Sequence, residues 1–123
     1  MSQTTMQQVI ITEPGGVDKL AYETVTIPKA KADEGLVKVH AFGINRPDIL
    51  QRQGLYPMPP GVTQVPGLEV AGEVVAVGAE VTQFKLGDKV CGLTNGGGYA
   101  EYCVVPQSQT LHIPENVSCV EAA

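Results

Sequence analysis

The chain has 123 residues, of which 43% are hydrophobic and 17% charged, a balance typical of one folded domain and not of a disordered chain. Its 13 acidic and 8 basic residues give a net charge of −5, which disfavours nucleic acid and anionic membrane surfaces as partners. No run approaches the roughly 18 apolar residues of a membrane span, and residues 1–8 lack the features of a signal peptide, so we expect a cytoplasmic protein.

Short apolar runs between glycine and proline turns dominate the sequence. Valine and isoleucine number 23 against 8 leucines, and β-branched side chains favour strands because a helix restricts their χ1 angle. The number and spacing of the runs predict a mainly β fold, a closed or partly open barrel. The predicted strands are 8–12, 20–27, 36–44, 68–77, 89–93, 99–105 and 110–113.

Two segments predict short helices. Between Asn45 and Gly54, a polar residue precedes a first-turn proline, Asp48 lies in the first turn, and Gly54 can end a helix of two turns. The second begins at Ser118, because Ser118 and Glu121 have the spacing of a capping box. Only five residues follow Ser118, too few for a stable helix, so we expect the chain to be part of a longer protein.

The three cysteines and the glycine-rich segments predict structure more than chemistry. Cys91, Cys103 and Cys119 have no disulfide or zinc-site spacing, and we expect buried or idle thiols. The glycines of residues 67–78 interrupt an apolar run, which is typical of bends, bulges or close backbone approach. Within that run, Glu69 is expected to be a buried carboxylate paired with a backbone or basic group.

Residues 67–81, GLEVAGEVVAVGAEV, followed by FKLGDKV at 84–90, resemble a signature of the medium-chain dehydrogenase/reductase superfamily. The amino-terminal half of that superfamily is a GroES-like β-barrel, which implies that residues 1–123 form this domain. Residues 45–57, NRPDILQRQGLYP, resemble its quinone oxidoreductase, or zeta-crystallin-like, branch. This resemblance implies NADPH-dependent reduction of quinones or activated alkenes, by an enzyme that is a homodimer or homotetramer.

The sequence departs from the zinc-dependent members of the superfamily at two positions. Asn45 stands where those members carry a cysteine ligand, and Leu68 stands where they carry a histidine ligand. An amide and an isobutyl group cannot replace a thiolate and an imidazole on zinc, so we expect no metal. Electron-poor alkenes and quinones remain plausible substrates, because they accept hydride without a Lewis acid.

The resemblance also implies the site residues. Asn45, Asp48 and Tyr56 are the expected catalytic residues, and the expected cofactor-binding residues are Asn45, Arg46, Pro47 and Leu50. Each catalytic candidate has a structural alternative: a helix cap for Asn45, a first-turn carboxylate for Asp48, and packing against prolines for Tyr56.

No strand, Gly-x-Gly-x-x-Gly turn and helix follow one another in this sequence, so we expect the Rossmann cofactor domain to lie outside it. The chain by itself is therefore expected to be inactive. Two other functions stay open, a freestanding GroES-like binding or scaffold module and a domain of an enoyl-thioester reductase.

Overall fold

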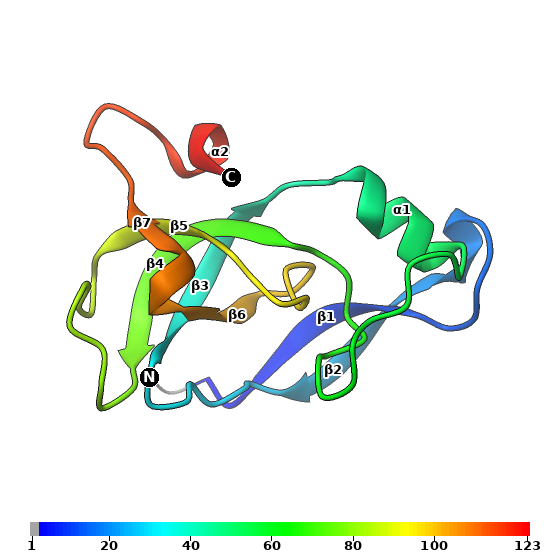
Figure 1. The fold of residues 1–123 in the computed structure, drawn as a ribbon, viewed down its shortest axis with the longest axis horizontal. Coiled ribbons are helices and arrows are strands. Elements are labelled where there is room, and N and C mark those ends of the chain that lie inside the picture. Colours follow the sequence, from blue (N-terminus) through cyan, green and yellow to red (C-terminus); the bar gives the residue numbers. More distant parts are fainter. Residues whose placement is uncertain (1–2) are drawn as a thin grey trace.

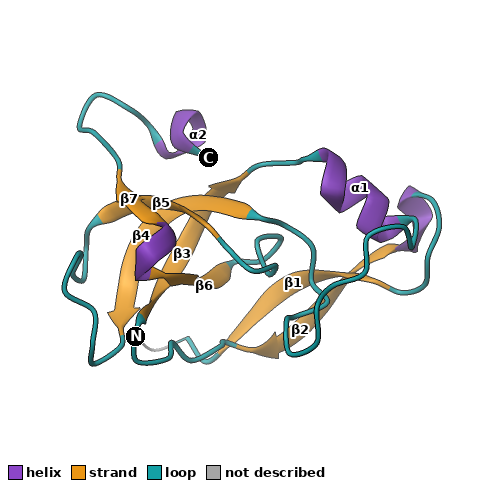
Figure 2. Ribbon diagram, in the orientation of Figure 1, coloured by secondary structure: helices purple, strands orange, loops and turns teal. Residues whose placement is uncertain are grey.

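The computed structural model describes residues 3–123 as a mainly β fold with two sheets and two short α-helices (Figures 1 and 2). The elements are β1 (Thr5–Ile11), β2 (Leu20–Thr26), β3 (Glu34–Phe42), α1 (Arg46–Arg52), β4 (Glu69–Val77), β5 (Lys89–Leu93), β6 (Tyr102–Pro106), β7 (Thr110–His112) and α2 (Cys119–Ala122). Every predicted strand is present, which confirms the mainly β prediction. The first begins earlier than predicted, at Thr5, because the polar start of β1 still pairs with β2.

The larger sheet has five antiparallel strands in the order β6-β3-β4-β5-β7, and β1 and β2 form a separate hairpin. The segment before β6 connects the two sheets. The Val9 N–H donates to the Tyr99 carbonyl (2.9 Å), and the Glu101 N–H donates to the Gln7 carbonyl (3.1 Å). The curled sheet and the attached hairpin therefore form the partly open barrel that the sequence predicts (Figure 1).

The core lies on both faces of β3. Val37 is fully buried in the main cluster inside the five-stranded sheet, whereas the adjacent Leu36 packs with Met6 and Tyr102 beneath the hairpin. The exposed residues Lys38, His40 and Phe42 come later in the strand, after this buried start. The main cluster consists of Val37, Val70, Val74, Phe84, Val90, Cys103 and Val105.

Both predicted helices are confirmed at their predicted caps. Asn45 is the N-cap of α1, and Gly54, with a φ of +81°, follows its last turn. At α2, Ser118 Oγ accepts a hydrogen bond from the Glu121 N–H (3.1 Å), and Glu121 Oε1 accepts one from the Ser118 N–H (2.9 Å). Local sequence is sufficient to place both helices because capping partners lie within four residues.

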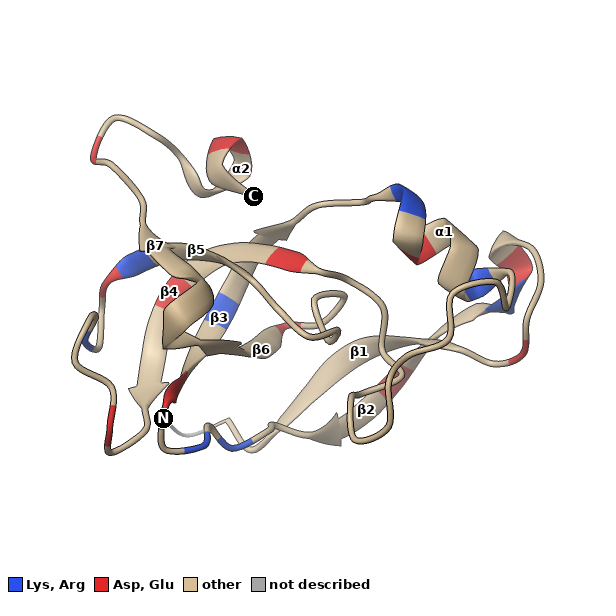
Figure 3. Cartoon of the chain, viewed as in Figure 1, with Lys and Arg blue, Asp and Glu red and all other residues tan. Residues whose placement is uncertain are grey.

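Basic and acidic residues are interspersed along the chain (Figure 3). Ion pairs join, for example, Lys89 to Glu73 (3.0 Å) and Lys19 to Glu13 (2.7 Å). Within residues 3–123, no helix is long and apolar enough to cross a membrane.

The three thiols are expected to differ in reactivity. All three cysteines are free, and Cys103 is buried whereas Cys91 and Cys119 are partly exposed. Burial raises the pKa of Cys103 to about 12, so almost no reactive thiolate forms near neutral pH. With a disulfide reagent at pH 8, we expect Cys103 to react on the order of 100-fold more slowly than the other two. Peptide mapping after timed labelling checks this, and labelling of Cys103 in the first phase would contradict the described packing.

Candidate functional site

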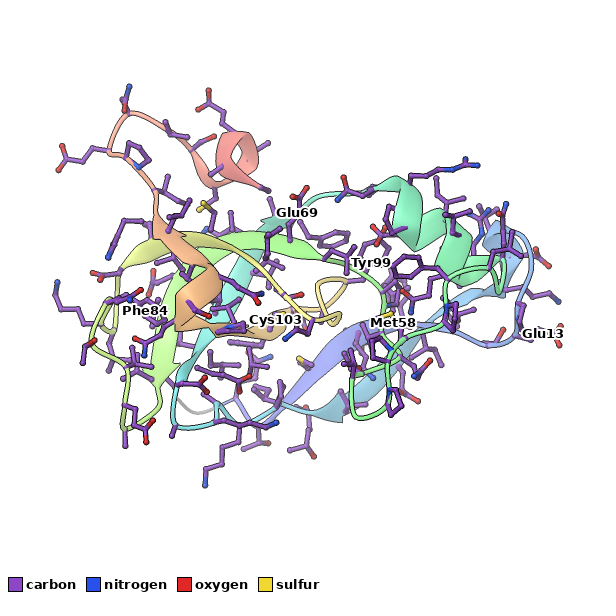
Figure 4. All side chains as sticks on the ribbon, viewed as in Figure 1. Glu13, Met58, Glu69, Phe84, Tyr99 and Cys103 are labelled. Atoms are coloured by element: carbon purple, nitrogen blue, oxygen red, sulfur yellow. The ribbon has the colours of Figure 1, made fainter. Side chains whose placement is uncertain are left out.

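Four segments meet at one end of the larger sheet: the end of β3, the start of α1, the start of β4 and the loop before β6. Figure 4 shows the labelled side chains of Glu69 and Tyr99 in this region, on the side toward α1. Polar side chains from these segments form a connected group that contains two of the predicted catalytic residues. The group, hereafter the Asn45 cluster, consists of Asn45, Asp48, Glu69 and Tyr99.

Asn45 lies at the N-cap of α1 in an extended conformation (φ −127°, ψ 162°). Its side-chain Nδ2 donates to Glu69 Oε1 at 3.1 Å. Because a carboxylate offers only acceptors, this contact requires the amide nitrogen, not the amide oxygen, to face Glu69. The structural role expected for Asn45 as a helix cap is thus present together with a fixed side-chain orientation.

Glu69 differs from the expectation in its partner. It is partly buried at the start of β4, and its hydrogen-bond partner is the Asn45 amide instead of a backbone or basic group. No local motif indicates this pair, since the two residues are 24 positions apart.

Asp48 is only 5% exposed, and one of its oxygens makes two hydrogen bonds. Asp48 Oδ2 accepts from the Asn45 backbone N–H (3.0 Å) and from the Tyr99 hydroxyl (2.9 Å). Its other oxygen, Oδ1, is buried without a hydrogen-bond partner among residues 3–123. The contact to Asn45 fits the first-turn structural role expected for this carboxylate.

Tyr99 was not among the predicted site residues, because its polar partner is 51 positions away in sequence. The side chain is 9% exposed, and its ring stacks on Phe42 with the centroids 4.5 Å apart. Burial and the hydrogen bond to the Asp48 carboxylate both raise the pKa of Tyr99 far above its usual value. The hydroxyl therefore remains a protonated donor over the whole physiological range of pH.

Gly67 explains how Tyr99 approaches the start of β4 so closely. Its φ is +107°, and a Cβ at this position would lie 2.7 Å from the Gly98 Cα and 2.7 Å from the Tyr99 ring. Only glycine fits both the backbone angle and the space. The glycine pattern of this segment therefore reflects close backbone approach, as the sequence predicts.

The other predicted site residues lie around α1. Tyr56 is 38% exposed and lines a cavity of about 300 Å³ together with Pro14, Gly54 and Pro57. The lining of this cavity includes no member of the Asn45 cluster. On α1 itself, Arg46 is exposed, and Pro47 and Leu50 are partly buried.

A larger cavity than the one beside Tyr56, of about 560 Å³, lies elsewhere in the molecule. It is bounded by β2, β6 and the loops at 60–63 and 95–97, and Cys103 forms part of its wall. None of its lining residues belongs to the Asn45 cluster. We assign the candidate site to the Asn45 cluster because convergent polar groups, and not volume alone, position a substrate.

The residues of the cluster do not fit a zinc ion. Zinc sites in proteins are built from cysteine, histidine and carboxylate ligands, usually three or four of them. Residues 3–123 contain no group of three such side chains placed to hold a metal. Asn45 and Glu69 are hydrogen-bonded to each other, and of the two only Glu69 is a carboxylate that could bind zinc.

Comparison with known proteins supplies the wider context. The family model described as alcohol dehydrogenase GroES-like domain matches residues 31–115. A synaptic vesicle membrane protein VAT-1 homolog from Danio rerio is 39% identical over 120 residues, which cover 97% of this chain and 25% of the relative. A quinone oxidoreductase from Sus scrofa is 37% identical over 123 residues, which cover 98% of this chain and 37% of the relative.

A solved structure of a mycobacterial protein complexed with NADPH matches with a TM-score of 0.82 and 35% identity, over 93% of this chain and 35% of that chain. The chain thus spans between 25% and 37% of the length of these three proteins.

Proposed function

Because the chain belongs to the alcohol dehydrogenase GroES-like domain family, we propose that it is the substrate-facing domain of an NADPH-dependent quinone oxidoreductase that works without zinc. The name of the porcine relative supports the reaction, and the mycobacterial structure supports the cofactor. The proposed substrates are quinones and activated alkenes.

The observation that carries this proposal is the amide of Asn45, held in place by Glu69. The amide has two N–H groups and uses one of them on Glu69 Oε1. The second has no acceptor among residues 3–123 and can donate to a carbonyl oxygen of a bound substrate. When a quinone or an enone accepts hydride, negative charge develops on such an oxygen, and a fixed donor stabilises it.

NADPH supplies the hydride when it is bound. This chain contributes the groups that orient the substrate. The side of α1 that would contact the cofactor, hereafter the cofactor edge, is formed by Arg46, Pro47 and Leu50. Arg46 supports this assignment, because it is exposed and takes part in no ion pair within residues 3–123. Its guanidinium is therefore free to bind an anionic cofactor group.

Zinc independence is proposed from the chemistry of the residues. The resemblance to the superfamily implies that Asn45 and Leu68 stand where zinc-dependent members carry ligands, and Glu69 accepts a hydrogen bond from Asn45. Without a metal, the stabilisation of the developing oxyanion depends on hydrogen-bond donors.

The proposal is tested with the complete protein that carries this chain. After dialysis against a chelator, we expect it to oxidise NADPH in the presence of a quinone at an unchanged rate, with no stoichiometric zinc by mass spectrometry. Residues 1–123 alone are expected to be inactive. Loss of activity on chelation with recovery on adding zinc would contradict zinc independence, and absence of quinone-dependent NADPH oxidation would contradict the reaction.

We also propose a cytoplasmic location and a homodimeric or homotetrameric complete protein. The net charge of −5, which disfavours anionic membrane surfaces, supports the location. One relative is named for a synaptic vesicle membrane, so cell fractionation is the direct test.

A further inference from the structure

We propose that Tyr99 is a positioning residue that fixes Asn45 in the site through Asp48. The inference is structural, and its kinetic consequence rests on the proposed function. Tyr99 has no hydrogen bond to Asn45 itself; both residues donate to the same oxygen, Asp48 Oδ2.

The Asp48 carboxylate depends on this pair of donors. It is 5% exposed, and its second oxygen has no partner among residues 3–123. A buried carboxylate loses much stabilisation when a donor is removed, because water cannot replace that donor without rearrangement. Without the Tyr99 hydroxyl, Asp48 would keep only the Asn45 N–H, and we expect the carboxylate to turn toward solvent.

The Tyr99 hydroxyl is well placed because three other segments hold the residue. Its ring stacks on Phe42 at the end of β3. Its backbone N–H donates to the Pro66 carbonyl (2.9 Å) before β4, and its carbonyl accepts from the Val9 N–H (2.9 Å) on β1. The hydroxyl is therefore a donor with a position set by the barrel and not by α1, so it anchors the start of α1 to the sheets.

The position of Asn45 follows from this anchor. The Asn45 backbone is fixed by Asp48, and its side chain is fixed by Glu69 on β4. A small displacement of a group that stabilises a transition state lowers the rate much more than it lowers substrate binding. Loss of the Tyr99 hydroxyl should therefore reduce kcat much more than it raises the KM for the quinone.

The test uses Tyr99→Phe in the complete protein, with Tyr102→Phe as a matched control. Both substitutions remove one hydroxyl from a buried tyrosine, since Tyr102 is 4% exposed and its hydroxyl donates to Gln3 Oε1 (3.1 Å). Tyr102 belongs to the cluster under the hairpin, away from Asp48. Hydrogen exchange of the peptide containing residues 45–52 and the kinetics of quinone reduction are measured for both variants.

We expect Tyr99→Phe to speed exchange in residues 45–52 selectively and to lower kcat about tenfold, with the KM for the quinone within about twofold of the original. Tyr102→Phe should do neither. In the double variant with Asp48→Asn, Tyr99→Phe should add no further loss, because both act through one carboxylate.

Unchanged exchange at residues 45–52, or exchange that rises equally throughout the chain, would overturn the proposal. Additive losses in the double variant would also overturn it. If the protein reduces no quinone, the proposed function fails, while the exchange measurement still decides the role of Tyr99.

Discussion

Asn45→Ala is expected to lower kcat for quinone reduction by about 100-fold in the complete protein, the effect typical of removing one oxyanion donor. The side chain donates to Glu69 and also caps α1, so the fold should lose about 1 to 2 kcal/mol of stability. Stopped-flow or steady-state oxidation of NADPH measures the rate, and circular dichroism checks that the fold remains.

Asn45→Asp sharpens this test because it keeps the size of the side chain and replaces the donor by an acceptor. The new carboxylate would face Glu69 Oε1 at the position where the amide nitrogen now lies, 3.1 Å away. Like charges this close repel, so we expect Asn45→Asp to be at least as inactive as Asn45→Ala.

Asn95→Ala is the matched control for both variants. Asn95 is an exposed asparagine that lines the larger cavity of about 560 Å³. We expect this variant to keep normal activity. A greater loss from Asn95→Ala than from Asn45→Ala would place the chemistry in the larger cavity and contradict the assignment of the site.

Gly72→Ala is expected to destabilise the domain by more than about 3 kcal/mol, the largest effect on folding that we predict. Gly72 is buried in β4, and a Cβ there would overlap the Lys38 backbone carbonyl on the paired strand β3 and lie 2.9 Å from Val37 Cγ1. Backbone cannot move aside as a flexible side chain can. The paired interior strands β3 and β4 of the larger sheet would have to separate.

Gly61→Ala separates this steric effect from the ordinary cost of replacing glycine. Gly61 has a φ of +83°, but a Cβ there meets nothing within 4 Å. We expect it to cost about 1 kcal/mol, the penalty for a left-handed backbone angle alone. Urea unfolding of both variants gives the comparison, and similar midpoints would show that β3 and β4 are not packed as described.

The sequence predicts those features whose partners are local. The seven strands follow from apolar runs and turns, and the caps at Asn45 and Ser118 follow from short motifs. A mainly β, GroES-like barrel was predictable on this basis together with the resemblance of residues 67–90 to a known superfamily.

The connections within the site could not be predicted in the same way. The bonds from Asn45 to Glu69 and from Tyr99 to Asp48 span 24 and 51 positions. No sequence motif predicts either pair. Each pair forms only when the end of β3, the start of β4 and the loop before β6 come together in the folded chain. The role of Tyr56 as a catalytic residue stays a prediction, as does the cofactor edge at Arg46, Pro47 and Leu50.

A crystal structure of the complete protein with NADPH and a quinone analogue is the most direct test of the account. We predict that a carbonyl oxygen of the analogue lies within hydrogen-bond distance of Asn45 Nδ2, with Glu69 still accepting from the same nitrogen and no metal at either side chain. A zinc ion bound by Glu69, or an analogue seated in the cavity beside Cys103, would contradict the account.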